Sequence, residues 1–142
     1  MKHKEDVSIK DSKGLNENHK RVISTVLGLL EKDLTLIEMH MKYEPCGRMY
    51  KIVNELTLQE KEDVLSSIKL LKESISEFAN KFGLQPTEEN MHGIIRGNSA
   101  INWANMCDIE PKRLNSYGKV GLDIYTELNQ QIEKIKKYLN VL

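Results

Sequence analysis

The stretch that decides the fold is residues 64–82, VLSSIKLLKESISEFANKF. Its apolar side chains recur at steps of three and four, at Val64, Ile68, Leu71, Ile75, Phe78 and Phe82. Such steps average about 3.5 residues and therefore line one side of an α-helix, whereas a strand face would need steps of two. Thr57 and Glu60 have the spacing of a capping box, so this helix should begin there. It should end before Gly83, because Gly83 followed by Leu84 is typical of a left-handed helix end.

Two further stretches show the same apolar spacing. One runs through Ile23, Leu27, Leu30, Leu34, Ile37 and Met41, and the other through Tyr125, Leu128, Ile132, Ile135, Leu139 and Leu142. The first predicts a helix from about Asn16 or Asn18 to Tyr43, because Pro45 disfavours helical angles in the residue before it. The second predicts a helix from about residue 120 to residue 142. Together the three stripes form the predicted core.

The segments between these stripes hold all three prolines of the chain. Residues 47–55 are expected to form a short helix of their own. Pro86 and Thr87 should introduce another long helix, with Thr87 as its N-cap, that continues through residues 91–109. Pro111 should open a turn or short helix that closes near Gly118.

Residues 1–15 alternate charged and small polar side chains and have little to bury, which predicts a mobile charged tail. The rest of the chain, residues 16–142, then forms a single helical domain. Because short connections between long helices favour antiparallel neighbours, the predicted fold is all-α, an up-and-down four-helix bundle.

Composition excludes several classes of partner and compartment. The chain has 21 Lys and Arg against 21 Asp and Glu, so it lacks the basic surface that nucleic-acid binding requires. Cys46 and Cys107 lie too far apart for a metal motif and are expected to be free thiols in a reducing compartment. No apolar run approaches the roughly 18 residues of a membrane span. These features predict a cytoplasmic protein with no membrane association.

The helix over residues 91–109 has unusual faces. One face, here called the Ile face, carries Met91, Ile94, Ile95, Ile101, Met106 and Ile109, with Asn98, Asn102 and Asn105 in its middle. The opposite face, here called the small face, carries Gly93, Gly97, Ala100, Ala104 and Cys107. A narrow strip between them carries His92, Arg96 and Ser99, with Trp103 on the same side. A helix that leaves so little for water is either central or packed against a second chain.

Each face predicts a contact. The small face allows another backbone to approach closely, so we expect it to be an interface, most simply with a second copy of the chain across a two-fold axis. The alternative is a contact with one of the first two long helices inside a single chain. If the Ile face is the core face, its three asparagines need partners. They then form either a network that fixes the packing register or, with Trp103, a binding site.

Tests for known chemistries favour a non-enzymatic protein. A di-iron bundle needs inward carboxylates and imidazoles from four helices. Here Glu89 with His92 and His40 with Glu44 are the only such pairs, and the stripes of the second and last long helices supply no further ligand. The sequence has no hydrolytic triad signature and no glycine-rich phosphate loop. We therefore expect no metal and no cofactor.

One segment resembles a known family. Residues 92–99, His-Gly-Ile-Ile-Arg-Gly-Asn-Ser, are similar to the phosphoacceptor helix of histidine phosphotransfer domains, which are four-helix bundles. The resemblance covers about a dozen residues and implies His92 as phosphoacceptor, with Arg96 as its basic neighbour. Here Arg96 and Gly97 come one position later than the family pattern places them. The main prediction is therefore an interaction or regulatory protein that acts through self-association or a protein partner, and histidine phosphotransfer is the alternative.

Overall fold

The computed structural model describes residues 14–142, so the predicted tail lies almost entirely outside the described residues. The all-α prediction is confirmed, because 73% of the described residues are helical and no named strand occurs among them. In order, the helices are α2 (Glu17–Lys42), α3 (Leu58–Phe82), α4 (Met91–Asp108), α5 (Pro111–Leu114), the 3₁₀-helix η1 (Asn115–Tyr117) and α6 (Leu122–Leu139). Four of these helices are long, as an up-and-down bundle requires. None of the described helices is long and apolar enough to cross a membrane.

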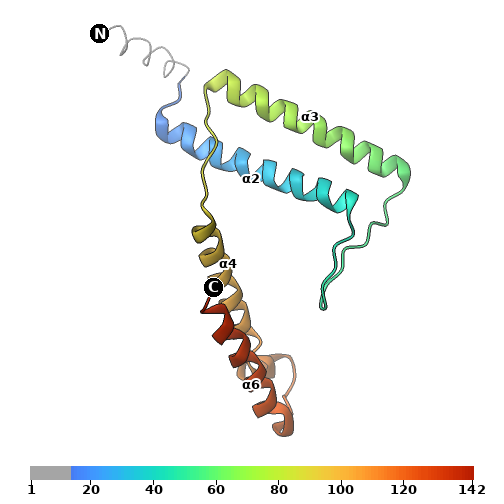
Figure 1. Ribbon diagram of the computed structural model, residues 1–142, viewed down its shortest axis with the longest axis vertical. Helices are drawn as coiled ribbons and strands as arrows, with labels where there is room; N and C mark the ends of the chain where they lie inside the picture. The colour runs from blue at the N-terminus through green and yellow to red at the C-terminus, as the bar shows by residue number, and fades with distance from the viewer. Residues whose placement is uncertain (1–13) are drawn as a thin grey trace. The chain divides into compact units, whose positions relative to one another are not determined.

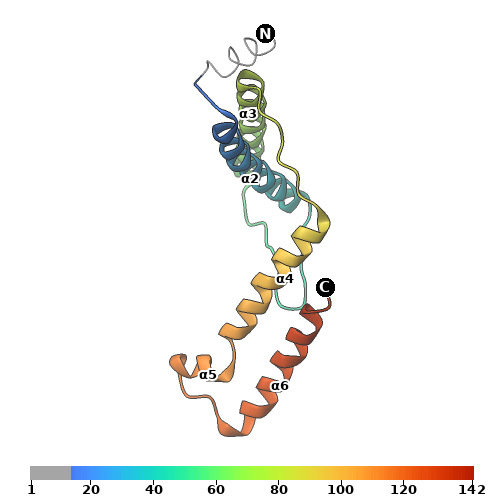
Figure 2. The same ribbon diagram turned by 90° about the vertical axis from the view of Figure 1, so that its left-hand side faces the viewer.

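The chain divides into two compact units, which we describe separately. The first unit comprises the described residues up to Thr87, and in it α2 and α3 pack side by side in antiparallel directions (Figure 1). The second unit comprises Glu88–Leu142, and in it α4 and α6 form a similar antiparallel pair, joined by α5 and η1 (Figure 2). Each unit is thus a helical hairpin. The single domain expected for residues 16–142 stays a prediction.

Side-chain caps explain where the two helices of the first unit begin. The Asn16 side chain accepts a hydrogen bond from the backbone N–H of His19 at 2.9 Å, and the His19 ring accepts one from Asn16 at 3.2 Å. The predicted capping box is present at the next helix, where Thr57 and Glu60 exchange hydrogen bonds of 3.1 and 3.0 Å. The bonds that Thr57 donates to it lower the pKa of the Glu60 carboxyl. Both helices therefore begin where the sequence predicts.

The end of α3 follows from Gly83. Its φ of +62° is in the left-handed region, which glycine adopts without steric cost. This turn lets the Leu84 N–H donate to the carbonyl of Ala79 at 2.9 Å, and the Leu84 side chain is buried. The predicted helix end at Phe82 is confirmed.

The predicted start of α4 is wrong. Its N-cap is Asn90 rather than Thr87, and the Asn90 side chain accepts a hydrogen bond from the backbone N–H of Gly93 at 2.8 Å. Asparagine is at least as good an N-cap as threonine, so the helix begins three residues later than expected. Glu88 and Glu89 consequently lie outside its first turn.

The short helix expected over residues 47–55 is also wrong. Cys46 and Lys51 form an isolated antiparallel bridge, and Gly47 donates to the carbonyl of Tyr50 at 2.8 Å. A Cβ at Gly47 would lie 2.8 Å from the exposed Tyr50 ring, so a larger residue in this tight turn would require that ring to move. Ile52 and Val53 lie on the extended segment that follows this turn.

The first unit buries only a narrow strip between its helices. Leu34 of α2 and Ile68 of α3 are 4% and 3% exposed. On one side of this strip Lys72 pairs with Glu38. On the other side the predicted core residues Leu30, Ile37, Leu71 and Phe78 are exposed, which corrects the expectation that the whole stripe is buried. Two helices can cover only the line along which they touch, so the outer half of each stripe stays in contact with water.

Candidate interaction surface on helix α4

Helix α4 carries very little charge. Only Arg96 and Asp108 among its 18 residues are Asp, Glu, Lys or Arg, although such residues make up 30% of the chain. The helix nevertheless contains no buried residue. A charge-poor helix that is nowhere buried exposes surface that water solvates poorly. For this reason α4 is the candidate site.

Helix α4 packs against α6 along the side that includes Ser99. Ser99, Met106 and Cys107 are the partly buried residues of α4, and Ile132 of α6 is 2% exposed. The Ser99 Oγ is buried and has no hydrogen-bond partner among the described residues. The contact with α6 is therefore centred on the side of α4 that includes Ser99, and of the Ile face only Met106 is partly buried.

A buried lysine joins the two helices of this unit. Lys136 of α6 is 7% exposed, and its Nζ lies 3.3 Å from the Glu110 carboxylate and 4.7 Å from the centre of the Trp103 ring. Glu133 adds a second carboxylate at 3.6 Å. Burial lowers the pKa of Lys136, but its interactions with Cys107 and Glu110 outweigh that effect and raise it. Lys136 is therefore a charged link at neutral pH, with its ammonium group balanced by Glu110 and placed over the Trp103 ring.

Sequence reasoning missed this link. Lys136 follows Ile135 and stands four residues after Ile132, so it lies on the flank of the apolar stripe, where a lysine normally reaches solvent. Glu110 precedes Pro111 outside any periodic pattern. Their positions gave no signal of a contact, because the contact depends on how α4 crosses α6.

Four of the five residues of the small face are exposed, and the fifth, Cys107, is partly buried. Gly93, Gly97, Ala100 and Ala104 are all exposed, and a Cβ built on Gly97 has no atom of a neighbouring element within 4 Å. The nearest atom to a Cβ at Gly93 belongs to its own cap, Asn90. The close packing that these residues permit is thus not used by α6.

The Ile face is uncovered as well, contrary to the expectation that it serves the core. Ile94 and Ile95 are 37% and 36% exposed, and Ile101 is 62% exposed. Asn98, Asn102 and Asn105, predicted as a binding cluster, are exposed, and their side chains make no hydrogen bond to another described residue. Their amides therefore need no buried partner. Trp103, placed in the same predicted cluster, instead contacts Lys136, whose Nζ lies over its ring.

His92 and Arg96 lie one helical turn apart on α4. Both are exposed, and neither forms an ion pair with another residue of the described chain. Within residues 14–142 no three His, Cys, Asp or Glu side chains are grouped so that they could hold a metal ion. Helix α4 thus presents an accessible imidazole beside an exposed guanidinium group.

Comparisons with known proteins add no assignment: no protein-family model matches the chain, and no curated protein and no solved structure is found to be similar to it.

Proposed function

We propose that this protein is a non-enzymatic helical interaction protein that acts by association through α4. The observation that carries the proposal is the uncovered, charge-poor surface of this helix. On a helical wheel the small face and the Ile face are adjacent, and all of their residues except Met106 and Cys107 are exposed. Burying the apolar part of this surface is favourable by about 25 cal/mol per Å².

A second copy of the chain is the simplest partner. Gly97 and Ala100 lie next to each other on the small face, so two α4 helices related by a two-fold axis could approach closely there. The equal numbers of acidic and basic residues, 21 of each, mean that two copies do not repel each other through net charge. We further propose the cytoplasm as the compartment, which suits the free thiols of Cys46 and Cys107.

Analytical ultracentrifugation tests self-association directly. A chain of 16.4 kDa should sediment with twice that mass at micromolar concentration. The variant Gly97→Leu should sediment as a folded monomer, because the added side chain meets open space within its own chain but would separate two α4 helices. Gln130→Leu is the matched control, since it adds the same side chain at an exposed position of α6 in the same unit, and it should remain a dimer.

Two results would refute self-association. One is a wild-type monomer at about 100 μM. The other is a Gly97→Leu variant that loses helical stability without any change in mass, because that result indicates a contact of α4 inside a single chain. Ala100→Leu repeats the test one turn further along the same face.

Histidine phosphotransfer is the second candidate function, and the exposure of His92 one turn from Arg96 is the observation that favours it. Incubation with acetyl phosphate, followed by intact-mass analysis, tests it. An acid-labile gain of one phosphoryl group that is lost in His92→Gln would support phosphotransfer. Under the interaction proposal neither the wild type nor the His92→Gln variant gains a phosphoryl group.

A further inference from the structure

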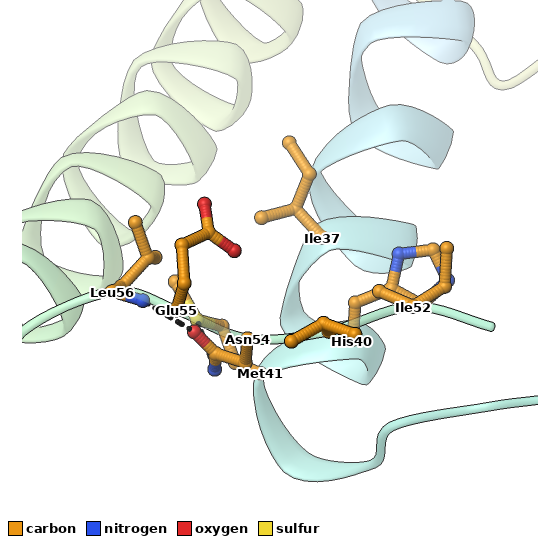
Figure 3. Close-up of a pocket in the computed structure, with 8 residues that line it drawn as sticks. Ile37, His40, Met41, Ile52, Asn54, Glu55 and Leu56 are labelled. Atoms are coloured by element: carbon orange, nitrogen blue, oxygen red, sulfur yellow. Dashed lines mark hydrogen bonds between the residues drawn. The ribbon is translucent and has the colours of Figure 1, made fainter.

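A cavity of about 200 Å³ lies in the first unit, where the last turns of α2 meet the extended segment that leads to α3 (Figure 3). Helix α2 contributes Ile37, His40 and Met41, and residues 52–56 form the opposite wall. This volume is below the roughly 300–1,000 Å³ of pockets for drug-sized ligands. It suits a ligand on the order of ten non-hydrogen atoms.

Hydrogen bonds hold both walls in place. The Ile52 N–H donates to the carbonyl of Pro45 at 2.9 Å, which ties the segment to the preceding turn. The Asn54 side chain accepts from the backbone N–H of Leu56 at 3.2 Å and donates to the Met41 sulfur at 3.7 Å. Asn54 thus connects the extended segment to α2.

The lining combines an apolar surface with two titratable side chains. Five of its residues are apolar: Ile37, Met41, Ile52, Val53 and Leu56. His40 belongs to α2 and Glu55 to the extended segment, as Figure 3 shows. Neither side chain forms an ion pair or hydrogen bond with another described residue. Glu55 supplies a negative charge at the cavity. The carbonyl end of the 26-residue helix α2 lies at the same place and also favours a positive charge.

We propose that this cavity binds a small organic ammonium ion with an apolar body. The ammonium group pairs with the Glu55 carboxylate, and the apolar body lies against Ile37, Ile52 and Leu56. The cavity belongs to the first unit, so this proposal is independent of the association proposed for α4.

NMR titration of ¹⁵N-labelled full-length protein tests the proposal with three probes of similar shape. 2-Phenylethylammonium carries the positive charge, 2-phenylethanol is its neutral counterpart, and phenylacetate is negative. The backbone amides of Ile52, Asn54 and Leu56 should shift saturably with the ammonium probe. An ion pair at a solvent-accessible site should make this probe bind about two- to five-fold more tightly than the alcohol, and phenylacetate should bind most weakly.

Two matched variants locate the charge effect. Glu55→Gln should reduce the affinity for the ammonium probe to that for the alcohol. Glu44→Gln removes an exposed carboxylate that does not line the cavity, so it should keep the preference. The proposal is overturned if no saturable shift appears at these amides up to about 20 mM. It is equally overturned if the ammonium and alcohol probes bind alike, or if the two variants have the same effect.

Discussion

The most discriminating test of the second unit compares Ile132→Ala with Ile135→Ala. Both residues belong to the same apolar stripe of α6, but Ile132 is 2% exposed and Ile135 is 47% exposed. The chemical change is identical, and the gain in helix propensity from Ile to Ala is the same at both positions, so it cancels in the comparison. Any difference in the free energy of unfolding therefore reports how much of each side chain is covered.

The expected difference follows from burial. Ile→Ala removes about three methylene equivalents, each worth roughly 0.8 kcal/mol when fully buried, which is about 2.4 kcal/mol at Ile132. The cavity left behind places the expected cost within the range of about 2–5 kcal/mol. At Ile135 roughly half of the transfer free energy, about 1.2 kcal/mol, is at stake, and no cavity forms at a solvent-exposed site.

Urea unfolding measures both values. Trp103 is the single tryptophan of the chain and lies over Lys136 of α6, so its fluorescence follows the second unit specifically. The experiment should be done at low protein concentration, where association cannot cover Ile135. If Ile132→Ala leaves too little folded protein, Ile132→Val with an expected cost of about 0.5–1.5 kcal/mol replaces it. Equal costs for the two alanine variants would show that α6 presents a different face to α4, and the packing described above would be wrong.

Three further predictions follow from single positions. Because the pKa of Lys136 is raised in the folded state, its contribution to folding stability is fully present below its ordinary pKa of 10.5 and is lost as the pH rises through the higher folded value. The variant Lys136→Met should therefore lose less stability than the wild type at alkaline pH, as measured by Trp103 fluorescence. Asn90→Ala should cost about 1 kcal/mol in urea unfolding and Thr87→Ala less than about 0.5 kcal/mol, and the opposite order would restore Thr87 as the cap. Gly97→Ala should stabilise the unassociated chain by up to about 1 kcal/mol, whereas Gly83→Ala should destabilise it by a similar amount. Both sites are sterically open, but of the two only Gly83 has a positive φ. Thermal denaturation that shifts the melting temperatures of both variants in the same direction would contradict this prediction.

The sequence alone determined where most helices lie. The starts of α2 and α3 and the end of α3 are set by interactions over three to five residues, such as the Thr57–Glu60 capping box and the left-handed turn at Gly83. These bonds join residues that are close in sequence, so residue types at fixed spacings are sufficient to predict them. Where two local solutions compete, as Thr87 and Asn90 do for the start of α4, spacing alone did not choose correctly.

Only the tertiary structure decided which side of each helix is covered. The spacing of Leu71 and Ile135 is that of core residues, yet both are exposed, because a single neighbouring helix covers less than the full width of an apolar stripe. On α4 the strip containing Ser99 faces α6, and the charge of Lys136 is buried against Glu110 and Trp103. Such contacts join residues far apart in the chain, and their free energy depends on how two helices cross, which a periodic pattern on either helix does not encode.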